Sequence, residues 1–233
     1  PIPRRLDAAT GELVPGLELL GYGVHQHTGH WQAWARLRLW WQAPGGLNTP
    51  LKVSARLLAP GGQPIAAVDA EPVAGAYPTT AWRPGEVVVD AYELPLPPGL
   101  PPGEYTPLVV VYDPATGAER GRVELAPVSL AAHPILPPRR ALEAGLARVA
   151  RARFRELSLV GWTPPGEGAT YGAGASVPLS LLWQAMEPAA GDWQVSFFLE
   201  GAGRRILLGR EPVGGPYPTD HWQEGQAVAQ WPA

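Results

Sequence analysis

The chain has 233 residues with 18 basic and 21 acidic side chains, so its charge is close to neutral and does not favour nucleic acid as a partner. It contains no cysteine, which excludes disulfides, thiolate metal sites and cysteine nucleophiles. Its 28 glycines and 29 prolines lie between apolar stretches, a pattern typical of turns between many short strands. No apolar run reaches the ~20 residues that are needed to span a bilayer.

Seven strand patterns follow one another in the first half of the chain. The alternation in residues 34–43 is the clearest, because Trp34, Arg36, Arg38 and Trp40 fall on one face and apolar residues fall on the other. Turn-forming Pro and Gly residues separate this pattern from the next ones. The predicted strands cover residues 17–24, 34–43, 51–58, 65–70, 86–94, 104–112 and 122–130.

This number and spacing of strands predict an all-β, immunoglobulin-like sandwich. Tyr105 follows a Leu-Pro-Pro-Gly turn before a late strand, as the tyrosine of an E–F corner does. The tryptophans of residues 34–43 are expected to place a large ring between the sheets. A jelly roll of two antiparallel sheets is the alternative, since it gives similar alternation.

The same short motif occurs twice, as AYPTTAWRPGE at residues 76–86 and PYPTDHWQEGQ at residues 216–226. Three further blocks recur in the same order: residues 17–22 match 157–162, residues 39–43 match 181–185, and residues 71–73 match 211–213. Four blocks in one order indicate a duplicated domain. We therefore predict tandem β-sandwiches, the first over residues 1–136 and the second over residues 155–233.

Residues 137–154 are expected to form a short helical linker between the copies. Leu142, Leu146 and Val149 follow a helical spacing, and several arginines flank them. This stretch is read either as a solvated helix that docks one face or as a basic surface for anionic lipid or glycan.

The second copy ends at the counterpart of the fifth strand of the first copy, so its last two strands have no counterpart in the sequence. A sandwich without two strands exposes a sheet edge. The missing strands can come from a longer parent protein, from another chain or from the N-terminal segment. The longer parent protein is the favoured source. We expect either an edge-strand dimer or a partial second sandwich.

The aromatic residues of the duplicated motif have two interpretations. Tyr77 and Trp82, with Tyr217 and Trp222 in the second copy, either close the end of each hydrophobic core or form platforms on which sugar rings stack. The first interpretation is favoured, because buried aromatic rings dominate core energetics. If the chain binds carbohydrate, Trp31 and Trp34 are further candidates for stacking.

Residues 25–30, His-Gln-His-Thr-Gly-His, are the best candidate for metal binding. Imidazole binds zinc and copper well, and His25 and His27 share a face if the strand continues, with His30 nearby. The second copy lacks these histidines, and the sequence fixes no carboxylate beside them, so an exposed polar loop is favoured over a metal site. We predict no cofactor.

No sequence motif indicates an enzyme. The carboxylates Asp69, Glu71, Asp90 and Glu93 are candidates for an acid–base pair, but the second copy has Arg210 and Gln230 in the regions of Asp69 and Asp90. Residues that support turns or strand edges are therefore the favoured interpretation. Phosphate-binding loops, dinucleotide fingerprints and nucleophile elbows do not occur.

The first copy resembles the soluble β-sandwich domains associated with bacterial multi-spanning membrane glycosyltransferases of the protein mannosyltransferase-like kind. The segments that carry the resemblance are Leu-Leu-Gly-Tyr at 19–22, Leu-Trp-Trp-Gln-Ala at 39–43, Tyr-Pro-Thr at 77–79, Trp-x-Pro-Gly-Glu at 82–86, Leu-Pro-Pro-Gly-x-Tyr at 100–105 and Tyr-Asp-x-x-Thr-Gly at 112–117. Asp69, Pro72, Asp90 and Tyr92 belong to the same pattern. The second copy keeps only part of it.

The resemblance implies a non-catalytic, extracytoplasmic module of the cell envelope. Its expected partners are the membrane portion of its parent protein or another envelope protein, and its role is spacing, docking or support. A carbohydrate-binding module is the alternative function, with a glycan as the partner.

Overall fold

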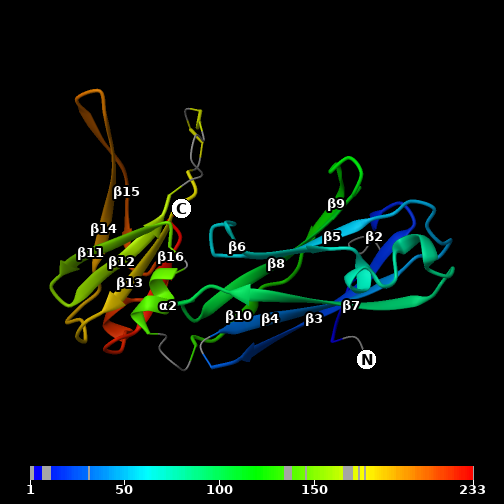
Figure 1. Cartoon of the computed structure of the whole chain (residues 1–233), viewed down its shortest axis with the longest axis horizontal. Helices are drawn as coiled ribbons and strands as arrows, with labels where there is room; N and C mark the ends of the chain where they lie inside the picture. Colours follow the sequence, from blue (N-terminus) through cyan, green and yellow to red (C-terminus); the bar gives the residue numbers. More distant parts are fainter. Residues whose placement is uncertain are drawn as a thin grey trace. The chain divides into compact units, whose positions relative to one another are not determined.

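The computed structural model describes residues 3–6, 12–30, 32–133, 138–144, 146–164, 170–172, 174–175 and 177–232 (Figure 1). Strands make up most of the regular structure, and α2 (Arg139–Ala144) is the single α-helix within these ranges, so the predicted all-β class is confirmed. No helix in the same ranges is long and apolar enough to cross a bilayer. The chain divides into unit 1, Pro1–Leu96 with Glu104–Leu130, and unit 2, Pro97–Gly103 with Ala131–Ala233.

Unit 1 contains two antiparallel sheets. The order of the first is β1 (Arg4–Arg5), β3 (Leu17–Thr28), β4 (Ala33–Gln42) and β7 (Val87–Leu96), and β2 (Glu12–Val14) also pairs with β3. The order of the second is β10 (Val128–Leu130), β8 (Gly103–Tyr112), β5 (Lys52–Leu58) and β6 (Pro64–Ala70), and β9 (Glu119–Glu124) also pairs with β8. Each of the seven predicted strands overlaps one or two of these elements.

The core of unit 1 follows from the alternation of β4. Leu37, Leu39 and Trp41 are completely buried on one face of this strand, whereas Trp34 and Arg38 point to the other face and keep solvent exposure. Trp41 is therefore the large ring that the sequence predicts between the sheets. The facing strands β5 and β8 supply fully buried aliphatic side chains, namely Val53, Ala55, Leu57, Val109 and Val111.

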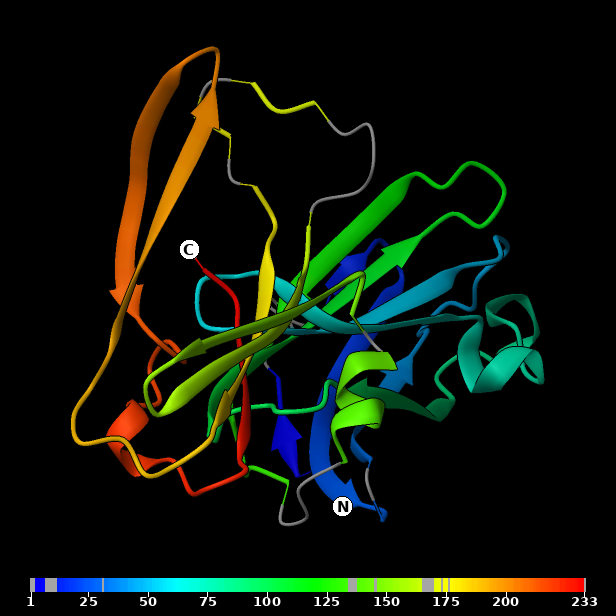
Figure 2. The same cartoon turned by 60° about the vertical axis from the view of Figure 1, so that its left-hand side comes forward.

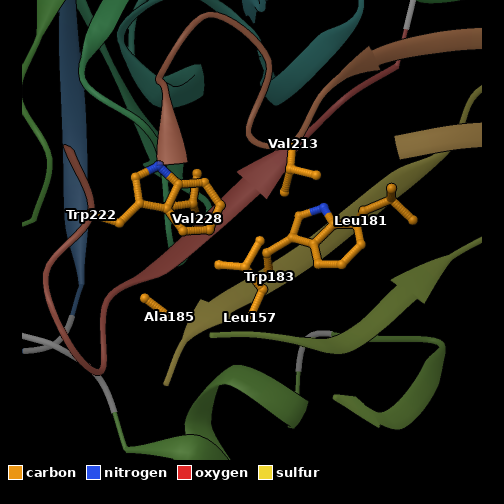
Figure 3. Packing of buried hydrophobic residues seen from close by; sticks show 7 residues of the cluster. All are labelled: Leu157, Leu181, Trp183, Ala185, Val213, Trp222 and Val228. Atoms are coloured by element: carbon orange, nitrogen blue, oxygen red, sulfur yellow. The ribbon is translucent and has the colours of Figure 1, made fainter. Parts of the chain in front are cut away.

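Unit 2 has a four-stranded antiparallel sheet and a separate hairpin. The sheet order is β11 (Arg148–Phe154), β12 (Leu157–Thr163), β13 (Ser180–Ala185) and β16 (Ala227–Gln230), and the hairpin consists of β14 (Gln194–Gly201) and β15 (Arg204–Pro212). Figure 3 shows the main core cluster of this unit, which contains Leu157, Leu181, Trp183, Ala185, Val213, Trp222 and Val228. A second cluster around Val160 and Leu182 holds α2 through Leu142.

The two units repeat the same strand arrangement. The order β1-β3-β4-β7 corresponds to β11-β12-β13-β16, and the hairpin β5–β6 corresponds to β14–β15. The registers agree as well, because Leu39 lies opposite Asp90 and the matching Leu181 lies opposite Gln230. The pairing of β3 with β4 has a register irregularity between Leu19 and Gly21, and the pairing of β12 with β13 has one at the matching point, between Leu159 and Gly161. The duplication seen in the sequence is thus also a duplication of topology.

The helix predicted over residues 137–154 is wrong for most of its length. Only α2 is helical, and Arg148–Phe154 form β11, which belongs to unit 2 and pairs with β12. Val149 lies opposite Gly161 as Arg5 of β1 lies opposite Gly21, so β11 is the first strand of the second copy. A Cβ on residue 161 would lie 2.3 Å from the carbonyl oxygen of Arg148, so glycine is required for this close approach. Sheet pairing overrides the helical spacing of the sequence here.

Candidate functional site

The duplicated motif forms a loop with the same conformation in both units. We call residues 76–86 the first loop and residues 216–226 the second loop. Pro78 and Pro218 hold an extended backbone, and each is followed by one 3₁₀ turn, Thr79–Ala81 or Thr219–His221. This turn places Trp82 or Trp222 at its end, where the backbone becomes extended again and enters β7 or β16.

The tryptophan of each loop faces the core. Trp82 is 5% exposed and Trp222 is 3% exposed. Their indole Nε1–H groups donate equivalent hydrogen bonds, to the carbonyl of Tyr77 at 3.0 Å and to the carbonyl of Tyr217 at 3.1 Å. Figure 3 shows the ring of Trp222 beside Val228 in the core cluster of unit 2. Both rings therefore close a core, and neither has an open face on which a sugar can stack.

A buried threonine ties each loop to the start of a strand in the opposite layer. The hydroxyl of Thr79 accepts the N–H of Leu51 at 3.0 Å and donates to the carbonyl of Thr49 at 3.0 Å. The hydroxyl of Thr219 makes the matching pair of bonds, accepting from Trp193 at 2.9 Å and donating to Gly191 at 2.9 Å. The two strands that begin here are β5 and β14.

A glutamine ties the other end of each loop to the first sheet. The side-chain amide of Gln42 donates to the carbonyl of Gly85 at 2.7 Å, and the N–H of Gly85 donates to the carbonyl of Ala43 at 3.0 Å. In unit 2 the equivalent bonds run from Gln184 to Gly225 at 3.1 Å and from Gly225 to Ala185 at 2.8 Å. Each loop is therefore bonded to both layers of its unit.

The loop tyrosines differ between the two units. Both are half-buried, but the hydroxyl of Tyr77 donates to Glu86 at 2.8 Å, whereas that of Tyr217 donates to the carbonyl of His221 at 3.2 Å. The bond to Glu86 raises the pKa of Tyr77, and bonds from Arg83 and Tyr77 lower the pKa of Glu86. Tyr217 stacks on Trp222 with ring centroids 6.4 Å apart. The polar ends of the two tyrosines thus do not form a shared binding arrangement.

A buried polar side chain lies behind each loop, and it is an acid in one unit only. Asp90 accepts the N–H of Val73 at 3.0 Å and the hydroxyl of Tyr92 at 2.5 Å. Burial raises the pKa of the Asp90 carboxyl, while the hydrogen bonds that it accepts oppose this rise. Gln230 occupies the same place in unit 2, where its side-chain oxygen accepts from Gly214 at 3.2 Å and from the indole of Trp183 at 3.0 Å.

The turns around this buried side chain differ between the two units. In unit 1 Val73 and Ala74 adopt left-handed backbone angles, with φ of 54° and 52°. In unit 2 the left-handed residues are Gly214 and Gly215, and Val213, the sequence counterpart of Val73, is not one of them. Asp90 thus supports a turn, in line with the structural interpretation of this carboxylate, but the sequence does not identify the backbone group that it binds.

The histidines of residues 25–30 do not form a metal site within the part of the chain that the structure describes, where no group of three His, Cys, Asp or Glu side chains has metal-binding geometry. His25 is exposed near the end of β3, and His30 lies beyond the strand. The Nε2 atom of His27 lies 2.9 Å from a carboxylate oxygen of Glu93, which also binds Arg36. The sequence fixes no carboxylate beside these histidines, and it is the register of β3, β4 and β7 that brings Glu93 to His27.

Trp34 is half-buried on the outer face of β4, where its ring packs edge-on against His27 with centroids 5.4 Å apart. Trp40 lies on the same outward row, and Arg36 and Arg38 lie between the two rings. Trp31 lies outside the described residues.

Comparison with known protein families and with curated proteins found no match to this chain. The threonine and the tryptophan that recur in the two loops are buried, and together with the glutamine they make equivalent internal hydrogen bonds in both units.

Replacing Thr79 by valine is expected to lower the free energy of unfolding by about 1–3 kcal/mol, because the change leaves the buried N–H of Leu51 without this acceptor and removes the donor to the carbonyl of Thr49. Valine keeps the shape of the side chain, so packing is preserved. Chemical denaturation followed by tryptophan fluorescence measures the effect. The control is Thr80→Val, at an exposed neighbouring position, which should change the free energy by less than about 0.5 kcal/mol. Equal effects of the two changes would contradict the role of the Thr79 hydroxyl.

Replacing Asp90 by asparagine is expected to change how stability depends on pH. Since the folded state raises the pKa of this carboxyl, its contribution to stability is complete below the ordinary aspartate pKa and is lost as the pH rises through the raised value. The stability of the native protein minus that of Asp90→Asn should therefore fall as the pH rises above the ordinary aspartate pKa of about 4. Urea denaturation at a series of pH values from about 4 upward measures the difference, and a difference that grows with pH would refute the assignment.

Proposed function

We propose that this chain is a non-catalytic, extracytoplasmic β-sandwich module that spaces, docks or supports a membrane protein of the cell envelope. The observation that carries the proposal is the bond-for-bond repetition of the two loops. The groups that both units keep are the buried threonine, the buried tryptophan and the glutamine, and each of them bonds to the chain itself.

The polar groups that offer chemistry to a ligand differ between the units. Glu86, the partner of Tyr77, is replaced by Gln226, and the acid Asp90 is replaced by Gln230. His27 and Glu93 lie together in unit 1, whereas in the sequence of the second copy Pro-Pro-Gly-Glu-Gly-Ala at residues 164–169 replaces the histidine segment. The two copies keep the residues that close the core, but their polar groups differ. This pattern supports a structural role for the loops rather than a duplicated active site.

The strand order supports an immunoglobulin-like sandwich in unit 1. With β3 to β9 taken as seven consecutive strands, the first, second and fifth form one sheet and the other four form the second sheet. Tyr105 is buried at the start of β8, the strand that corresponds to F. Modules of this architecture commonly act as spacers and docking domains on cell surfaces, and the resemblance to domains associated with membrane glycosyltransferases points to the same setting.

A reporter fusion tests the proposed location. Alkaline phosphatase, which needs disulfides and is active only outside the cytoplasm, is fused after Trp231 in the native gene. We expect high phosphatase activity, and low activity of a matched β-galactosidase fusion, which works only in the cytoplasm. The opposite pattern would refute an extracytoplasmic module. Hydrolysis of glycosides, esters or phosphomonoesters by the purified chain, above the rate of a heat-unfolded sample, would refute the non-catalytic role.

Carbohydrate binding is the second candidate, and the outward row of β4 is the observation that favours it. Trp34 and Trp40 are six residues apart on one strand face, which corresponds to about 20 Å, and two arginines lie between them. If this row binds an oligosaccharide, Trp34→Ala should weaken binding at least about 10-fold in isothermal titration calorimetry. Val149→Ala, at an exposed aliphatic residue of β11 in unit 2, is the control and should leave the affinity unchanged. Equal affinities of all three proteins would exclude the row as the site.

A further inference from the structure

One edge of the hairpin in unit 2 has no partner strand. Within the described residues β14 pairs with β15 alone, and the two strands form a sheet of their own. The corresponding strand of unit 1 is paired on both sides, with β6 on one edge and with β8 along the whole of Lys52–Leu58 on the other. In unit 1 the free edge that β14 has in unit 2 is therefore covered by an antiparallel neighbour.

The same hairpin exposes large apolar side chains. Five residues of β14 and β15 are between 43% and 61% exposed, namely Phe198, Leu199, Ile206, Leu207 and Leu208. Figures 1 and 2 both show the tip of the hairpin (orange) projecting beyond the strands of the four-stranded sheet. An apolar hairpin with a free edge is typical of a surface that pairs with another strand.

The inner face of β14 is only partly covered. Val195 and Phe197 pack against the core cluster of Figure 3 but remain partly exposed, and Leu199 on the same face is 57% exposed. Their counterparts at the start of β5, Val53 and Ala55, are fully buried. The difference corresponds to the cover that β8 supplies in unit 1.

We propose that β14 pairs antiparallel with β14 of a second copy of this chain. The result is a continuous four-stranded sheet in the order β15-β14-β14-β15 across a two-fold axis. The hairpin of the partner then takes the position next to β14 that β8 and β9 take next to β5. This proposal is independent of the proposed function, because it concerns only the free edge.

The sequence of β14 fits itself when the two-fold axis passes through Phe197. Each residue of β14 then lies opposite the residue of the partner that is equally far from Phe197 on its other side. On the inner face, Val195 therefore lies opposite the partner's Leu199, and Phe197 lies opposite the partner's Phe197. On the outer side Ser196 faces the partner's Phe198, and Gln194 faces the partner's Glu200. No like charges meet, and every inner pair is apolar.

The alternation of β14 is continuous through this region, which the self-pairing requires. The irregularity of the hairpin lies on the other strand, where Leu208 is the extra residue between Leu207 and Gly209. Glu200 is already paired with Arg205 inside the hairpin, so its charge does not oppose the new contact. Because a strand donated by an unrelated protein has no such built-in match, a second copy is the favoured occupant.

Sedimentation velocity on the whole chain tests the proposal. We expect a concentration-dependent dimer, and Leu199→Lys should weaken dimerisation at least about 100-fold, because it places a charge on the inner face opposite Val195. Leu208→Lys adds the same charge at a comparably exposed site on β15, away from the free edge, and should leave the dimer intact. Both variants should keep the circular dichroism of the native chain, since neither residue belongs to the core.

A cysteine pair tests the register directly. The chain has no cysteine of its own, so Gln194→Cys combined with Glu200→Cys should form intermolecular disulfides under mild oxidation. Each single variant should not cross-link, because in this register neither residue lies opposite itself. A monomer at all concentrations, a dimer that survives Leu199→Lys, or cross-linking of the single variants would each overturn the proposal.

Discussion

The hydroxyl of one buried threonine in each unit is the contact on which the rest of the sandwich depends. It sits between an N–H and a carbonyl at the entry of a strand in one layer, while the same loop is bonded through glycine and glutamine to the other layer. The loop leads from one layer to the other, and without the threonine hydroxyl the buried N–H of Leu51 would lose its acceptor. The tryptophan that follows then fills the end of the core. The motif repeats proline, threonine, tryptophan and glycine at fixed spacing because each of them occupies one fixed place in the loop that closes the core.

The sequence was sufficient to predict the strands of unit 1, because one face of each is buried and the alternation of apolar residues reports that face directly. It was also sufficient to predict that Trp82 and Trp222 close the cores, since the repeated motif preserved them while the residues between varied. It failed at β11, where the apolar residues happen to follow a helical spacing and only pairing with β12 reveals a strand. It also failed for His27 and Glu93, which are far apart in sequence and meet through the register of three strands.

The two units differ in the surfaces that they expose. In unit 1 the outer face of the first sheet carries a polar cluster of His27, Arg36 and Glu93 beside Trp34. In unit 2 the apolar hairpin is the prominent surface among the described strands. These two surfaces fit our proposal of a module that docks to other macromolecules.

The left-handed turn behind the first loop carries a backbone cost that its counterpart in unit 2 avoids. A β-branched residue at positive φ, such as Val73, is strained, by about 1–3 kcal/mol in general, and its N–H donates to the side chain of Asp90. In unit 2 both left-handed residues of the turn are glycines, and the N–H of Gly214 donates to the amide oxygen of Gln230. The turn of unit 1 therefore stores strain that the surrounding fold has to hold in place, whereas the turn of unit 2 adopts its shape without that cost.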